Sequence, residues 1–166
     1  DLFERWSKDC PGFIKDGVVE PSKYGASPKK VLYLLKEAND KKAVEEGGWD
    51  LKEFLREPNR PQTWDNIALW QYGLENLNKD YNWQELEAKC SLEFRKEQIS
   101  KIAVVNVKKQ AGTHTAKGKQ LWEHASTDRE LLKEQIDMYK PDLIICCGTP
   151  TGSILRKLEL VEPFDK

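Results

Sequence analysis

The chain has 166 residues, of which 39% are hydrophobic and 33% are charged, and this length fits a single domain that buries a core of its own. Its 27 basic and 28 acidic residues give a formal net charge of -1, so contact with nucleic acid would need a local cluster of positive charge. The sequence has no apolar run of the ~20 residues that a membrane helix needs and no segment typical of a leader, so we expect a cytoplasmic protein without membrane contacts.

Residues 1–30 are interrupted by prolines and glycines, which predicts a short helix over residues 2–8 followed by loops. We expect this segment to form a flap over a core made by residues 31–166. The core begins with residues 31–35, a continuous apolar run that predicts a strand buried on both faces.

Helices are predicted to follow this first strand. Residues 50–56 form a short helix, and residues 64–78 form an amphipathic one because their apolar side chains recur at near-helical spacing. Residues 84–100 predict a further helix with interleaved charges on its solvated face. The apolar and β-branched residues 102–107 then predict a second buried strand.

The last third of the chain predicts one more helix and strand. Thr127 and Glu130 have the spacing of a capping box, which predicts a helix from there to Tyr139. Residues 142–147 predict a third strand, which Gly148 ends. Strands that alternate with helices favour a parallel sheet covered on both faces. We therefore predict one α/β domain with three layers, α/β/α, around a central, mainly parallel sheet.

The cysteines predict no metal site. They are irregularly spaced, and two of them are neighbours in an apolar run, which is typical of reduced thiols in a core; they are Cys10, Cys90, Cys146 and Cys147. The sequence also has no Gly-rich phosphate loop and no nucleophile elbow. We expect neither a metal nor a cofactor.

Candidate site residues follow the first predicted strand, because ligands of open parallel sheets bind beyond the carboxyl ends of the strands. Glu37, Asn39 and Asp40 combine carboxylates and an amide, which can position or deprotonate a water. Trp49, beside two glycines, offers a flat ring on which a base can stack. The alternatives are that the polar residues cap the next helix and that Trp49 belongs to the core.

Asn106 ends the second predicted strand. A buried amide without partners costs roughly 1–3 kcal/mol, so this side chain needs a ligand or a protein partner. Its donor and acceptor lie side by side and match the edge of a pyrimidine or an adenine. The alternative is a hydrogen bond to a neighbouring loop backbone.

Basic residues follow Asn106. The run 108–119 contains four lysines and His114 but no acidic residue. We interpret Lys108, Lys109 and Lys117 as contacts to the phosphates of a nucleic acid. The alternative is a solvated loop.

The order of these features resembles the uracil-DNA glycosylase superfamily. Residues 36–40, Lys-Glu-Ala-Asn-Asp, share a Glu-Ala core with the family's motif after the first strand, which is of the type Gly-Glu-Ala-Pro-Gly. The strand that ends in Asn106 is similar to the family strand whose asparagine binds the flipped base. Residues 141–148 are similar to the family pattern Pro-x-x-Ile-x-x-x-Gly.

The resemblance implies the family's fold and a DNA glycosylase. A damaged base such as uracil, flipped from single- or double-stranded DNA, would be held by Asn106 while Glu37 or Asn39 orients water and Lys108 and Lys109 contact phosphate. It also implies a further strand and a His-Pro loop, which these residues do not contain. A non-catalytic module of the same fold that binds a nucleobase or nucleic acid is the alternative, and an unrelated α/β enzyme acting on a small nucleotide-like substrate is another.

Overall fold

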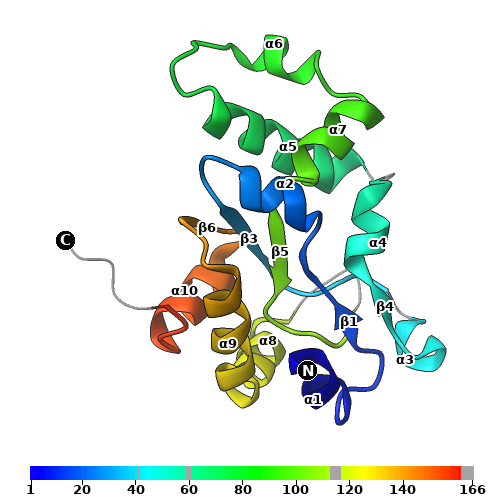
Figure 1. Cartoon of the computed structure of the whole chain (residues 1–166). Coiled ribbons are helices and arrows are strands. Elements are labelled where there is room, and N and C mark those ends of the chain that lie inside the picture. The colour runs from blue at the N-terminus through cyan, green and yellow to red at the C-terminus, as the bar shows by residue number, and fades with distance from the viewer. Residues whose placement is uncertain (41, 59–60, 113–116, 162–166) are drawn as a thin grey trace.

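The computed structural model describes residues 1–40, 42–58, 61–112 and 117–161, and it is a mixed α/β structure with a small, mostly parallel sheet (Figure 1). The strands are β1 (Ile14–Lys15), β2 (Gly17–Val18), β3 (Val31–Leu35), β4 (Trp49–Asp50), β5 (Ala103–Asn106) and β6 (Leu143–Cys146). The helices are α1 (Leu2–Ser7), α2 (Pro21–Ala26), α3 (Ala43–Glu46), α4 (Leu51–Arg56), α5 (Pro61–Glu75), α6 (Trp83–Glu87), α7 (Leu92–Ile99), α8 (Gly118–Thr127), α9 (Arg129–Tyr139) and α10 (Thr149–Lys157).

The main sheet has the order β2-β5-β3-β6. Strand β3 lies in the middle and pairs in parallel with both β5 and β6, while β2 pairs with β5 in the antiparallel direction. Strands β3, β5 and β6 are the three strands that the apolar runs predict, and their parallel pairing is confirmed. Their carboxyl ends therefore meet at one edge of the sheet.

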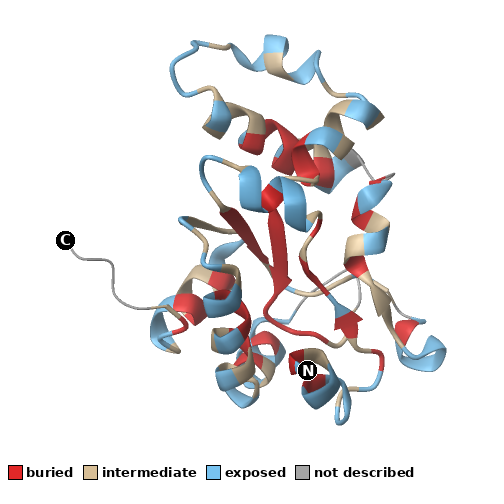
Figure 2. Ribbon diagram, in the orientation of Figure 1, coloured by how far each residue is buried: buried red, intermediate tan, exposed pale blue. Residues whose placement is uncertain are grey.

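Both faces of β3 and β5 are buried, which explains why these strands are apolar without alternation. Leu32 and Leu34 of β3 pack into a core cluster with residues of α1, α8, α9 and α10. Val31 and Tyr33 point to the other face and join residues of α4, α5 and α7. Figure 2 shows buried residues concentrated in β3 and β5 and on parts of the surrounding helices, while β4 and β6 are intermediate.

Residues 1–30, which we predict as a flap, contribute to both sheets. Strand β2 forms the edge of the main sheet next to β5, and β1 pairs in parallel with β4 in a separate two-stranded sheet. Between β1 and β2, Asp16 is completely buried. The segment thus places a buried charge beside the carboxyl end of β5.

Two helix predictions are wrong in detail. The single helix predicted over residues 84–100 is two helices, because Ser91 caps the start of α7 by accepting a hydrogen bond from the Phe94 amide. The predicted capping box at Thr127 is absent, since that residue ends α8 and its hydroxyl donates to the Glu123 carbonyl. Within the described ranges, none of the helices is both long and apolar enough to span a bilayer.

Candidate functional site

A pocket of about 580 Å³ lies at the carboxyl ends of β3 and β5. It brings together residues that are far apart in the sequence. Its lining includes five of the predicted site residues, which are Glu37, Asn39, Asp40, Trp49 and Asn106. The lining also includes apolar side chains from α4 and α5 that the sequence did not single out.

Backbone hydrogen bonds past the strand ends hold the two sides of this site together. The Lys108 amide donates to the Lys36 carbonyl at 3.0 Å, so the parallel pairing continues beyond β3 and β5. The Gly112 amide then donates to the Ala38 carbonyl at 2.8 Å, and the Asp40 amide donates to the Gly112 carbonyl at 3.2 Å. Residues 36–40 therefore run alongside residues 108–112.

Glu37 is held by a lysine and a glycine from the opposite segment. Lys108 Nζ lies 2.6 Å from Glu37 Oε2, and the two side chains are only 7% and 6% exposed. A Cβ at Gly112 would lie 2.1 Å from Glu37 Oε1, so only glycine leaves room for the carboxylate in this position. The carboxylate lines the pocket in a fixed place and is paired with a cation.

Asp40 and Asn39 have different surroundings. The Asp40 carboxylate accepts hydrogen bonds from the Lys42 amide at 3.0 Å and from Trp49 Nε1 at 2.9 Å. It therefore orients the indole ring as well as lining the pocket. Asn39 is exposed at the mouth.

Aromatic rings form one wall of the pocket. Trp49 meets Phe54 of α4 with ring centroids 6.1 Å apart, and Phe54 meets Trp64 of α5 at 6.4 Å. Strand pairing positions the backbone of Trp49, which lies opposite Ile14 in the β1–β4 sheet. Such a wall suits a flat, partly apolar ligand.

Asn106, at the end of β5, is only 1% exposed and lines the pocket. Its backbone amide donates to Asp16 Oδ2 at 2.7 Å, and its side-chain Nδ2 donates to the same oxygen at 3.2 Å. The protein partner of this amide is therefore a buried carboxylate. The loop backbone that we considered as its alternative partner is not the group that holds it.

Asp16 also holds Lys109 and Gln135. Lys109 Nζ lies 2.7 Å and 2.9 Å from the two Asp16 oxygens, and Gln135 Nε2 donates to Oδ1 at 2.9 Å. Burial lowers the pKa of Lys109, while the Asp16 charge acts in the opposite direction. Sequence reasoning missed Asp16; the available signal was one acidic residue between the apolar pairs at 13–14 and 18–19.

The predicted phosphate contacts need correction at two of three lysines. Lys109 is 0% exposed and ion-paired with Asp16, and Lys108 is bound to Glu37, so neither ammonium is open to a phosphate. Lys117 is exposed just before α8 but does not line the pocket. Lys36 and Lys42 are also exposed, and both follow β3. Residues 113–116, which include His114, lie outside the described residues.

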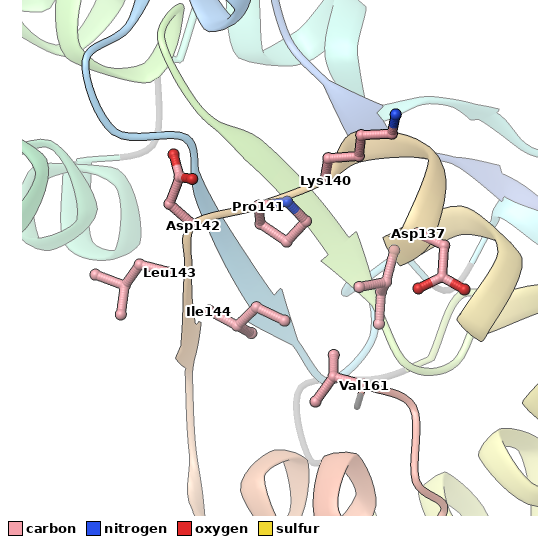
Figure 3. Close-up of a pocket in the computed structure, with 8 residues that line it drawn as sticks. Asp137, Lys140, Pro141, Asp142, Leu143, Ile144 and Val161 are labelled. Atoms are coloured by element: carbon pink, nitrogen blue, oxygen red, sulfur yellow. The ribbon is translucent and has the colours of Figure 1, made fainter. Parts of the chain in front are cut away.

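Two further pockets of the described chain are lined by other residues than the predicted site residues. One of about 250 Å³ lies at the amino end of β6 and is lined by Asp137, Lys140 and Asp142 together with apolar side chains (Figure 3). Another of about 400 Å³ lies between α1 and α8 beside Cys10 and His124. Among the described residues, no group of three or more His, Cys, Asp or Glu side chains is placed to hold a metal ion.

The large pocket thus combines an aromatic wall, a buried amide and a fixed carboxylate at one sheet edge. These groups can stack on a planar ring, form hydrogen bonds with its edge and orient a water molecule. Comparison of the chain with protein-family models, with curated proteins and with solved structures found no match.

Proposed function

We propose that this chain is a DNA glycosylase-like enzyme of the uracil-DNA glycosylase type, which receives a flipped base in the large pocket and hydrolyses its N-glycosidic bond. The observation that carries the proposal is the convergence of Glu37 and Asn106 on one pocket with Trp49. The sequence resemblance assigns these positions to water orientation and base recognition, and the geometry is compatible with both.

The size and chemistry of the pocket support a nucleobase as ligand. A volume of about 580 Å³ is within the range of sites for small organic molecules. The rings of Trp49, Phe54 and Trp64 supply a stacking surface, which favours any base because every base has a flat π-face. The amide of Asn106 offers its oxygen as an acceptor for the edge of the base, and it offers one N–H, since the other N–H is bonded to Asp16.

Hydrolysis in this pocket follows from the position of the carboxylate. With the base held by Asn106, the bond between the base and C1′ of the sugar breaks toward an oxocarbenium-like state, and the base leaves with the electron pair. A water oriented by Glu37 or Asn39 attacks C1′, and its proton passes to the departing base anion directly or through solvent, which leaves a C1′ hydroxyl and a neutral base. Lys36 and Lys42 are exposed and lie close in sequence to residues that line the pocket, so they are the candidates for contact with the DNA backbone.

A specific observation favours the second candidate function, a non-catalytic module that binds a nucleobase or nucleic acid. The Glu37 carboxylate is already paired with Lys108 at 2.6 Å, which weakens it as an acceptor for a water proton. In a binding module, Glu37 would form part of the pocket wall, and Asn106 would recognise the base without cleavage.

Incubation with oligonucleotides distinguishes these functions. The chain is mixed with single- and double-stranded DNA carrying uracil, and alkaline scission then reveals abasic sites. For the enzyme, we expect scission that falls about 100-fold or more in Glu37→Gln or in Asn39→Ala, depending on which side chain orients the water. Matched controls are Glu93→Gln and Asn66→Ala, because both residues are exposed and neither lines the pocket.

Each outcome of this experiment supports one of the two functions or contradicts both. Scission that depends on Glu37 or Asn39 supports the glycosylase. Binding of the oligonucleotide without scission, weakened by Asn106→Ala, supports the binding module. Absence of both scission and binding with every substrate contradicts both functions.

A further inference from the structure

The buried carboxylate of Asp16 controls which atoms of Asn106 are left for a ligand. Asp16 is the one residue between β1 and β2, its side chain is 0% exposed, and its carboxylate is hydrogen-bonded to Asn106. It is not among the residues that line the pocket. Its effect on a ligand therefore has to pass through Asn106.

Two hydrogen bonds from one residue to one oxygen fix the Asn106 amide. The backbone nitrogen and the side-chain Nδ2 of Asn106 both donate to Asp16 Oδ2, at 2.7 Å and 3.2 Å. Rotating the amide by half a turn would bring its oxygen against the carboxylate, and two acceptors without a hydrogen between them repel each other. Nδ2 consequently faces Asp16, and Oδ1 is turned away from it.

Asp16 is itself held in place by a cation and a second amide. Lys109 Nζ bonds to both carboxylate oxygens, and Gln135 Nε2 donates to Oδ1. The ammonium of Lys109 also lies 4.7 Å from the ring centroid of Trp6, which closes this cluster on another side. A buried carboxylate with these partners has no room to rotate away from Asn106.

We propose that Asp16 is a positioning residue that sets the hydrogen-bonding polarity of the pocket by locking the Asn106 amide in one orientation. The inference rests on the proposed function, since it takes a nucleobase as the ligand. With Nδ2 committed to Asp16, Oδ1 is the acceptor left for the ligand, and it selects a base edge that offers an N–H at this place. Cytosine presents a bare ring nitrogen at the position where uracil presents N3–H, so the lock favours uracil.

The test uses a variant that changes the lock without leaving a buried charge alone. Asp16→Asn by itself would leave the buried Lys109 ammonium without a carboxylate partner, so the variant is Asp16→Asn combined with Lys109→Met. Asn at position 16 can donate as well as accept, which allows the Asn106 amide to turn. The matched control is Asp142→Asn, because Asp142 also accepts a backbone amide, that of Lys30 at 2.7 Å, but lies outside the large pocket.

The first readout is the NMR signal of the Asn106 side-chain amide in the free protein. In the wild type, one of its two hydrogens is expected downfield of the corresponding hydrogens of exposed Asn66, because it faces a charged acceptor. The shift is expected to vanish in the double variant and to persist in Asp142→Asn. A wild type without the downfield signal overturns the inference even if the double variant does not fold, and so does a folded double variant that retains the signal.

The second readout is binding of free uracil and free cytosine, followed by quenching of tryptophan fluorescence. The wild type is expected to prefer uracil, and the double variant is expected to lose about tenfold or more of this preference. An unchanged preference in a folded double variant overturns the role of Asp16. If the wild type binds neither base, the proposed function fails, while the NMR readout still decides whether Asp16 locks Asn106.

Discussion

The Glu37 carboxylate fills the space that a side chain at Gly112 would need, since a Cβ at position 112 would lie 2.1 Å from Glu37 Oε1 and 2.2 Å from its Cδ. The backbone of Gly112 is not in the left-handed region, so alanine fits the chain at this place and only the carboxylate has to move. We predict that Gly112→Ala lowers scission of uracil-containing DNA about 100-fold through displacement of Glu37, and that it also lowers the melting temperature because buried Lys108 loses its partner.

The control for this substitution is Gly73→Ala in α5, where an added Cβ meets no atom within 4 Å. That variant is expected to keep full activity and to gain a few tenths of a kcal/mol to about 1 kcal/mol in unfolding free energy, because alanine favours helix. Full activity in Gly112→Ala would show that the exact place of Glu37 does not matter.

The pair of Lys108 and Glu37 is buried, so removal of one partner leaves a charge without compensation. We predict that Lys108→Met lowers the free energy of unfolding by roughly 3–5 kcal/mol. The double variant Lys108→Met with Glu37→Gln is expected to recover much of that loss. Chemical denaturation of the wild type, both single variants and the double variant measures the coupling between the two side chains.

An exposed pair provides the control for this cycle. Lys119 and Glu123 of α8 are 3.8 Å apart with side chains 89% and 58% exposed, and their coupling is expected to be within about 0.5 kcal/mol of zero. Equal coupling in the two pairs would contradict a structural role of the Lys108–Glu37 pair.

Trp49 has two separable contributions, its ring and its N–H. Trp49→Phe keeps a ring but loses the hydrogen bond to Asp40, and we predict a loss of roughly 1–2 kcal/mol in unfolding free energy. Trp49→Leu also removes stacking and is expected to weaken base binding about tenfold or more. Trp83→Phe, at a position 51% exposed on α6, is the control. Base binding that is the same in Trp49→Leu and the wild type would remove this ring from the binding site.

Strands β3 and β5 were predictable because burial on both faces leaves mainly apolar residues in them. The edge strand β6 is half-buried and was predictable from its apolar run. Leu32 and Tyr33 point to opposite core clusters, so the run carries no polar alternation that would confuse the prediction. The ends of the helices were harder to predict from the sequence than the strands. The capping box of this chain lies at Asn82 and Glu85, and the same spacing at Thr127 and Glu130 forms none. A short pattern of this kind depends on where the neighbouring helix ends, which the sequence does not show.

The meeting of Glu37 and Asn106 was predictable from one rule, because parallel strands end at the same edge of a sheet. The roles of Lys108 and Lys109 were not. Their partners are 71 and 93 positions away in the chain, and a run of lysines predicts solvent or phosphate contacts unless those partners are known. The burial of Asp16 was not predictable for the same reason, since it depends on β2 joining the sheet.

Alkaline pH should unfold this protein through side chains that are buried in their neutral forms. Burial raises the pKa of Tyr24 to about 12 from 10.0, and it raises the pKa of the Cys147 thiol to about 11 from 9.0. Above about pH 9, the unfolded chain therefore releases protons that the folded chain retains. The stabilising contribution of these two groups is fully present below about pH 9 and is lost as the pH rises toward 12.

Melting temperatures measured between about pH 8 and pH 12 test this expectation. Tyr24→Phe removes one titrating group, so the decline above pH 10 is expected to be shallower than in the wild type. Tyr81→Phe is the control, because a hydrogen bond with Tyr72 lowers the pKa of Tyr81 and the folded state does not resist its ionisation. A decline equally steep in Tyr24→Phe and the wild type would mean that the Tyr24 hydroxyl, which donates to the Tyr139 carbonyl at 3.3 Å, ionises in the folded protein as readily as in the unfolded chain.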